Sequence, residues 1–264
     1  QNIIKTSKNC SFFRNACNFF IFEKSPYLKN IQKKKLKNFK VNWLKKLNKI
    51  NNFPTIFLAN EFFDSLPIKQ FEKKNNDWFE KYVEISSKNK RFVEKKINFK
   101  KIENIIGKNI TKRKKFIEFS PLMIQILKEI SKIVNKQNGG LLIIDYGFFN
   151  KKMFNSLQSV KKHRKNDVLK NVNHSDISHL VNYKLIEKII KKLKLKINGF
   201  STQRNFLIKL GILERAEIIS KNLPFLMKAN IYYRVKRLID NKQMGEIFKV
   251  MFISNRKINF KLGF

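Results

Sequence analysis

Residues 55–71 read TIFLANEFFDSLPIKQF, an apolar run that passes directly into acidic side chains. A short apolar run bounded by polar residues is typical of a strand buried on both faces. Two other stretches have the same form: NFFIF at 18–22 runs into Glu23, and LLII at 141–144 runs into Asp145. Helical patterns separate these runs, and the alternation predicts an α/β fold with a doubly wound, mostly parallel sheet.

The other elements follow from turn residues and periodicity. Pro26 and Pro121 are each expected at the first position of a helix, and Gly139-Gly140 is expected to end the second helix. Asn75, Asn76 and Asp77 are typical turn residues and predict a hairpin between 68–73 and 78–85. Further helices are expected at 2–15, 183–193 and within 205–237, and further strands at 39–43, 197–202 and 247–253.

We expect these elements to form one domain over residues 1–264. Residues 86–115 are dense in lysine and lack a clear period. This segment is therefore expected to be a basic insertion or an irregular edge region.

The formal net charge is +39, which taken alone would suggest a nucleic-acid partner. Only nine of the 58 basic residues are arginine, and the lysines are spread along the whole chain with an excess of Asn, Ile and Phe. These four residue types share A/T-rich codons, so a genomic base bias explains them together. We expect no specific nucleic-acid partner, and any binding to RNA should weaken steeply with salt.

Composition also bounds the location and the cofactors. No apolar run reaches the roughly 18 residues of a membrane span, and no secretory signal is visible. Cys10 and Cys17 fit neither a redox motif nor a metal site, so no metal is expected. A cytoplasmic protein is expected, or one of the mitochondrial matrix if the organism is eukaryotic. Because the first residue is Gln1 and not Met, we expect a fragment.

The carboxylates after the strands are the first candidates for chemistry. In open α/β sheets ligands bind at the carboxyl ends of the strands, where Glu23, Glu61, Asp64 and Asp145 are expected. A carboxylate there can accept hydrogen bonds from ribose hydroxyls. The alternative is that each one caps a following helix.

Several segments resemble the MidA-type S-adenosylmethionine-dependent methyltransferases. FEKSPYLKNIQKKKL at 22–36 is similar to the family's E-x-S-P-x-L-x-x-x-Q segment, and ANEFFDSLPIKQF at 59–71 to its most specific signature. Later blocks match in order: IIDYGF at 143–148, SLQSVKKH at 156–163, SDISHLVNY at 175–183, TQRNFLIKLGILER at 202–215 and MGEIFKV at 244–250. This family includes the mitochondrial complex I assembly-factor arginine methyltransferase.

The resemblance implies a class I methyltransferase fold, Rossmann-like, with S-adenosylmethionine as cofactor. The family's first strand and glycine-rich cofactor loop have no counterpart among the eight glycines. The loop brings backbone close to the cofactor, so we expect this chain to bind the cofactor poorly and to be inactive alone.

Roles carry over residue by residue. Glu23 is expected to hold the ribose, Asn42 and Trp43 to contact adenine, and Asn60 to lie beside the methionine moiety. Glu61 and Asp64 are the expected catalytic clamp, because two carboxylates can grip the guanidinium of an acceptor arginine. Helix capping remains the alternative for both.

Four further residues are expected on the acceptor side: Asp145, Tyr146, His163 and Asp176. His174 and His179 fall where the family has no histidine and are interpreted as incidental. Asn173-His174, Leu180 and Asn182 depart from the family pattern, which puts substrate contacts in doubt.

The sequence therefore predicts a methyltransferase acting on an arginine of a protein partner, by resemblance a respiratory complex subunit. One alternative is an RNA or DNA methyltransferase, although ANEFFDSLP is not the base-flipping motif of such enzymes. The other is a non-catalytic assembly protein that keeps the fold.

Overall fold

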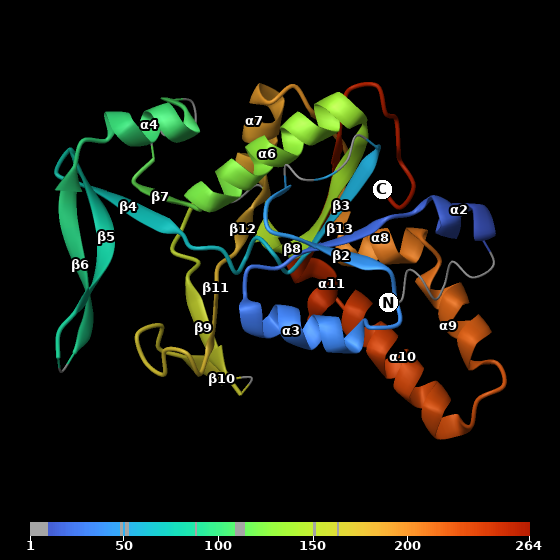
Figure 1. The fold of residues 1–264 in the computed structure, drawn as a ribbon. Coiled ribbons are helices and arrows are strands. Elements are labelled where there is room, and N and C mark those ends of the chain that lie inside the picture. The colour runs from blue at the N-terminus through green and yellow to red at the C-terminus, as the bar shows by residue number, and fades with distance from the viewer. Residues whose placement is uncertain are drawn as a thin grey trace. The chain divides into compact units, whose positions relative to one another are not determined.

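The computed structural model describes residues 10–47, 50, 53–87, 89–108, 114–149, 152–162 and 164–264 (Figure 1). Internal contacts divide the chain into two compact units, residues 1–53 and 54–264, where the sequence led us to expect one domain. None of the helices within these described ranges is long and apolar enough to cross a membrane.

The N-terminal unit is a small β-α-β arrangement preceded by a short helix. Helix α2 (Ser11–Ala16) leads to β1 (Phe19–Phe22), α3 (Pro26–Lys35) and β2 (Val41–Leu44). The two strands pair in parallel, with Phe20 opposite Asn42. Pro26 begins α3 as expected, and the hydroxyl of Ser25 accepts a hydrogen bond from the Leu28 amide at 3.3 Å. Strand β1 is half-buried along its length.

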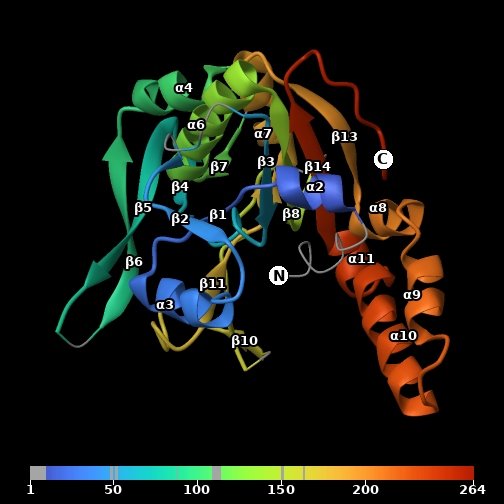
Figure 2. The ribbon, with the colours of Figure 1, turned by 45° about the vertical axis from the view of Figure 1, so that its right-hand side comes forward.

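A five-stranded sheet is the centre of the larger unit (Figure 2). Strand β8 (Gly139–Phe148) pairs in parallel with β3 (Thr55–Asn60) and with the short β12 (Val181–Asn182). On its other side lies β14 (Phe248–Ser254), antiparallel to both β8 and β13 (Lys196–Thr202). Only β14 therefore opposes the common direction, and the expected mostly parallel sheet is confirmed.

Two helices pack against the sheet. Helix α6 (Pro121–Gln137) begins at Pro121 as expected, and the Ser120 hydroxyl caps it by accepting from the Met123 amide at 3.1 Å. Helix α7 (Tyr183–Lys192) is capped by Asn182, which accepts from the Leu185 amide at 3.0 Å. Both helices contact β8, and their apolar faces are buried. The core lies between these faces and the sheet.

A four-stranded antiparallel sheet follows β3. It contains β4 (Lys69–Lys74), β5 (Asp77–Ile85), β6 (Lys90–Ile97) and β7 (Phe116–Phe119), in the order β6-β5-β4-β7. The expected hairpin is confirmed, with Asn75 and Asn76 at positive φ in its turn. The segment 86–115, expected to be irregular, holds the edge strand β6 and helix α4 (Lys100–Ile106), and residues 109–113 lie outside the described ones.

The remaining elements flank the central sheet. Strands β9 (Gln158–Lys161), β10 (Arg164–Asn166) and β11 (Asp176–Ser178) form a small antiparallel sheet. Helices α8 (Gln203–Lys209), α9 (Ile212–Ser220), α10 (Phe225–Ile239) and α11 (Met244–Ile247) connect β13 to β14. Figure 2 shows α9 and α10 side by side, projecting away from the central sheet.

Two details differ from the sequence interpretation. TIFLA was expected to be buried on both faces, but Ile56 and Leu58 on β3 are 66% and 60% exposed. Among the described residues of the larger unit, β3 pairs only with β8, so it is an edge strand there. Strand β8 also continues to Phe148, which places Asp145 inside the strand and not after it.

Truncating the centre of β8 should destabilise the larger unit strongly. Ile143 is fully buried, so Ile143→Ala should lower the free energy of unfolding by about 2–5 kcal/mol, because it removes packing and leaves a cavity. Ile85→Ala is the matched control, since that side chain is 71% exposed, and should change it by at most about 0.5 kcal/mol. Equal losses in urea unfolding would contradict the placement of the core.

Candidate active site

The chain turns sharply where β3 ends. Glu61 donates its backbone N–H to the Ile144 carbonyl at 3.0 Å, which extends the pairing of β3 with β8 by one residue. Its φ is +46°, in the left-handed region that a residue without a short polar side chain seldom adopts. A strained backbone of this kind persists only where the surroundings hold it, and it is common at functional sites.

The carboxylate of Asp145 holds this turn. Its Oδ2 accepts three consecutive backbone N–H groups, from Phe62 at 3.2 Å, Phe63 at 2.9 Å and Asp64 at 3.3 Å. Its Oδ1 accepts the Tyr146 N–H at 2.9 Å. The residue has no exposed surface, whereas the sequence led us to expect it on the acceptor side. Its contacts assign it to shaping the 61–64 turn instead.

Burial raises the pKa of Asp145 to about 7, with a further contribution from the nearby charge of Asp64, while hydrogen bonds from the Phe63, Asp64 and Tyr146 amides oppose the shift. Burial likewise raises the pKa of Asp64 to about 6, and the charge of Glu61 adds to the shift. The two carboxyl groups thus titrate near neutral pH, as functional groups often do.

Asp64 and Glu61 differ in exposure. The Asp64 residue is 7% exposed, and no helix follows it: residues 63–66 form a turn that leads into β4. The capping alternative therefore does not apply to either carboxylate. Glu61 is exposed beside Asn60, whose Nδ2 donates to Glu61 Oε1 at 3.4 Å. Glu61 and Asn60 are thus exposed at this turn, whereas Asp64 retains only a small accessible surface.

Tyr146 lies near the carboxyl end of β8, directly after Asp145. Its ring is half-buried against Phe248, with ring centroids 3.9 Å apart. Burial raises its pKa, and the charges of Glu61 and Asp64 add to the shift, whereas the charge of Arg237 opposes it. Glu61, Asp64 and Arg237 are therefore each close enough to Tyr146 to act on it electrostatically. Arg237 belongs to α10, and no sequence pattern singled it out because its spacing on that helix is ordinary for an exposed residue.

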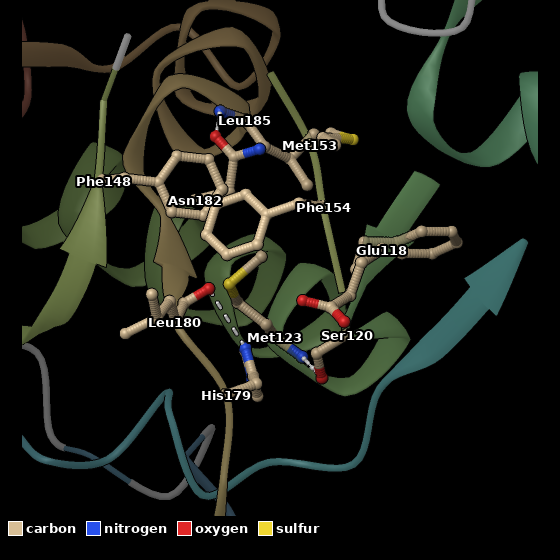
Figure 3. Close-up of a pocket in the computed structure, with 11 residues that line it drawn as sticks. Glu118, Ser120, Met123, Phe148, Met153, Phe154, His179, Leu180, Asn182 and Leu185 are labelled. Carbon is tan, nitrogen blue, oxygen red and sulfur yellow. Dashed lines mark hydrogen bonds between the residues drawn. The ribbon is translucent and has the colours of Figure 1, made fainter. Parts of the chain in front are cut away.

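His179 was interpreted as incidental, but it is buried next to this turn. Its backbone N–H donates to the Asp64 carbonyl at 3.0 Å, and its Nε2 has no hydrogen-bond partner among the described residues. Figure 3 shows the ring beside Glu118, Ser120 and Met123. The cavity there is about 10 Å³, the space of one water molecule, so it is too small for a substrate.

Glu118 fixes the wall of this cavity. Its carboxylate accepts from Gln70 Nε2 at 2.6 Å, from the Ser156 N–H at 3.2 Å and from the Ser156 hydroxyl. Such a buried carboxylate with several donors rigidifies its surroundings. The cluster supports the segment that carries His179.

One predicted residue stands apart from the turn, and the placement of another is not described. Asp176 is exposed at the start of β11, opposite Val160 of β9, and has no recorded contact with Glu61 or Asp145. His163 lies outside the described residues. The three acidic groups brought together are Glu61, Asp64 and Asp145, and within the described residues no cluster of His, Cys, Asp or Glu could hold a metal ion.

The N-terminal unit contains the predicted nucleoside residues. Glu23 follows β1 directly; its Oε1 accepts the Ser25 N–H at 2.8 Å and its Oε2 accepts Gln32 Nε2 at 3.1 Å. Asn42 and Trp43 are neighbours on β2, and adjacent strand residues point to opposite faces. The two therefore cannot both contact one adenine from the same face. Trp43 points to α3, where its Nε1 donates to Gln32 Oε1 at 3.0 Å.

Residues 1–201 match the profile of the family described as "Putative S-adenosyl-L-methionine-dependent methyltransferase". The chain belongs to this methyltransferase family. The cofactor of the family is S-adenosylmethionine.

Two relatives of this chain are named protein arginine methyltransferases. The mitochondrial NDUFAF7 protein of Danio rerio is 27% identical over 81% of this chain, and the Caenorhabditis elegans homologue is 29% identical over 66%. The matched parts are 51% and 42% of those proteins, so the chain spans about half the length of these relatives.

The fold is also found in a crystal structure from Burkholderia thailandensis bound to S-adenosylhomocysteine. The two structures superpose with a TM-score of 0.75, at 23% identity, over 93% of this chain and 66% of that one. The expected α/β methyltransferase fold is thereby confirmed.

The N-terminal unit contains a carboxylate that can accept further hydrogen bonds. A carboxylate offers about four lone-pair positions, and Glu23 uses two of them among the described residues of the unit. Ribose hydroxyls are donors of the kind that the other two positions accept. Asn42 is exposed on β2 and can offer its amide to a base edge.

The raised pKa of Asp145 should make the free energy of unfolding of the larger unit depend on pH. An unfolded aspartate ionises near pH 4, whereas folded Asp145 ionises near pH 7. Between these values unfolding releases a proton, so this group's contribution is fully present below about pH 4 and is lost as pH rises to about 7. Asp145→Asn should remove that part of the pH dependence.

Urea unfolding from pH 4 to 8 measures this pH dependence of the free energy of unfolding. The stability difference between wild type and Asp145→Asn should be largest at the acid end and shrink toward pH 7. Asp167→Asn is the control, because Asp167 is an exposed carboxylate that accepts one backbone N–H, from Leu169 at 2.9 Å. A stability difference between wild type and Asp145→Asn that grows with pH would contradict the raised pKa of Asp145.

Proposed function

We propose that this chain carries the active site of a protein arginine methyltransferase. The observation that supports the proposal is Glu61, an exposed carboxylate on a left-handed backbone turn that Asp145 holds through three amide hydrogen bonds. A side chain fixed in this way at the carboxyl end of a strand is pre-organised to bind a ligand.

The chemistry of the cluster fits a guanidinium acceptor. Glu61 and Asp64 interact electrostatically with each other and with Tyr146. A planar guanidinium binds carboxylates through two parallel hydrogen bonds, which also fixes its orientation. In this proposal Glu61 grips the guanidinium, and its charge keeps the acceptor nitrogen aligned.

Methylation of a guanidinium nitrogen also requires the loss of one proton. S-adenosylmethionine, when bound, supplies an electrophilic methyl group on a sulfonium. Asp64, with a pKa of about 6, is mostly ionised at neutral pH and can accept the proton. The half-buried Tyr146 ring and the buried Phe248 ring limit water beside Asp64 and Asp145, which strengthens the charge interactions there.

The nucleoside end of the cofactor is assigned to Glu23, with Asn42 as a contact for the base. Asn60 is assigned to the methionine end. Asp145 is assigned to positioning, Asp176 is kept as an acceptor contact outside the cluster, and His163 is kept as an acceptor contact.

The partner is proposed to be a protein. The relatives' names support an arginine acceptor and a mitochondrial location. For this chain we propose a soluble compartment, the mitochondrial matrix in a eukaryote and the cytoplasm otherwise, with a respiratory complex subunit as the first acceptor to test.

Removing the charge of Glu61 should lower the rate of methyl transfer without weakening cofactor binding. In the full-length protein, with the glycine-rich segment restored, Glu61→Gln keeps the size and leaves Asp145 in place, so affinity for S-adenosylhomocysteine should change little. Methyl transfer should fall by about 10²-fold or more, equal to about 2.7 kcal/mol of transition-state stabilisation. The measurements are equilibrium dialysis and the incorporation of labelled methyl groups into candidate proteins.

The matched control is Glu84→Gln, an exposed glutamate on β5 that pairs with Arg91 at 2.7 Å. It should leave both quantities unchanged. Undiminished methylation by Glu61→Gln would refute the clamp, and a collapse of cofactor binding would move Glu61 to the donor side.

A further inference from the structure

Glu23, Gln32 and Trp43 form a hydrogen-bonded chain across the N-terminal unit. Glu23 follows β1, Gln32 lies on α3, and Trp43 lies on β2, so the three residues connect all the elements of the β-α-β arrangement. Gln32 Nε2 donates to Glu23 Oε2 at 3.1 Å, and Trp43 Nε1 donates to Gln32 Oε1 at 3.0 Å. All three side chains are half-buried.

The orientation of the Gln32 amide is fixed by its partners. The indole N–H of Trp43 can only donate, and an ionised carboxylate can only accept. The amide oxygen must therefore face Trp43 and its NH₂ group must face Glu23. A glutamate at position 32 could not donate to Glu23 when ionised, and an apolar residue could satisfy neither partner.

This amide fixes one of the two carboxylate oxygens, and the Ser25 N–H fixes the other at 2.8 Å. Both oxygens of Glu23 are thus held by donors from α3 or its cap. About two lone-pair positions of the carboxylate accept nothing from the part of the unit that the structure describes. Two acceptor positions at fixed orientation match a pair of neighbouring hydroxyl groups, such as the 2′ and 3′ hydroxyls of a ribose.

We propose that Gln32 is a positioning residue for the nucleoside end of the cofactor. It holds the Glu23 carboxylate in the orientation that accepts two vicinal hydroxyls, and it anchors that orientation to the Trp43 indole. The inference rests on the proposed function, because it takes Glu23 as the ribose ligand.

A purely structural role for Gln32 would give a different result. If Gln32 only joins α3 to β2, its loss should lower stability without a selective loss of nucleoside affinity. If it positions Glu23, affinity should fall more than in a control of equal stability. The test therefore needs one measurement of the contact itself and one of binding.

The contact can be followed at the indole. The chain has two tryptophans, so its ¹⁵N spectrum has two indole N–H resonances, and Trp78→Phe assigns them. Gln32→Leu should shift the Trp43 resonance upfield and speed its exchange with solvent, because the hydrogen bond is lost. The Trp78 resonance should not move, since that ring stacks on Phe99 at 3.9 Å in the larger unit.

Binding is measured by equilibrium dialysis against labelled S-adenosylhomocysteine up to millimolar concentration. Gln32→Leu should weaken binding by about tenfold or more, as expected for a lost hydrogen bond to a charged group. The matched control is Gln125→Leu, because Gln125 Nε2 also donates to a glutamate, Glu129 Oε1 at 3.0 Å, on helix α6. It should bind within about twofold of wild type.

Gln32→Glu adds a readout that a structural role would not produce. At pH 8 two carboxylates face each other, and binding should be weak. As pH falls toward 5.5 the pair shares a proton, position 32 donates again, and affinity should recover. Wild type and Gln125→Glu should show no such recovery.

The outcomes separate the two proposals. An unmoved Trp43 resonance, or Gln32 variants that bind as the Gln125 controls do, would overturn the inference and leave the cofactor assignment intact. With the glycine-rich segment restored, a Glu23→Gln variant that binds as wild type does would instead refute the assignment of Glu23, and the inference with it. A moved Trp43 resonance together with selective loss of affinity supports the inference.

Discussion

The buried carboxylate of Asp145 is the interaction on which the candidate active site depends. It gathers the N–H groups of Phe62, Phe63 and Asp64 on one oxygen, and those groups would otherwise be buried without partners. The same bonds hold the turn that keeps Glu61 at a positive φ. The position of β8 in the sheet thus fixes the position of the exposed carboxylate. The interaction joins two segments about 80 residues apart, so it connects the fold directly to the chemistry.

Much of this arrangement could be predicted from the sequence. Apolar runs ending in acidic residues located β1, β3 and β8, and Pro26, Pro121 and the Asn75-Asn76 turn located helices and a hairpin. These signals are local, because caps and turns depend on neighbouring residues. The sequence did not distinguish an edge strand from a central one, so the exposure of Ile56 and Leu58 was missed. It also did not give the regular structure within 86–115, where lysines mask the period-two pattern of an exposed strand.

The site was predicted less completely. Spacing indicated that Glu61, Asp64 and Asp145 would lie close together, and they do. It could not show that Asp145 points to backbone amides and not to a ligand, because that depends on the turn of a distant segment. It could not place Arg237 or His179 either, since both reach the site through tertiary packing. The sequence showed Gln32 only as one residue of a motif. Its hydrogen bonds to Glu23 and Trp43 in the structure are what indicate a positioning role.

The place of β14 in the sheet has a consequence for how the larger unit is made. This strand is formed by residues 248–254, yet it lies between β8 and β13 and supplies buried side chains along its whole length. The sheet cannot be completed until these residues have left the ribosome. Until then, one edge of β8 has no strand to pair with. Contacts between such distant parts of a chain form slowly. During synthesis the unfinished sheet therefore exposes a long apolar edge, which makes it a candidate client for chaperones.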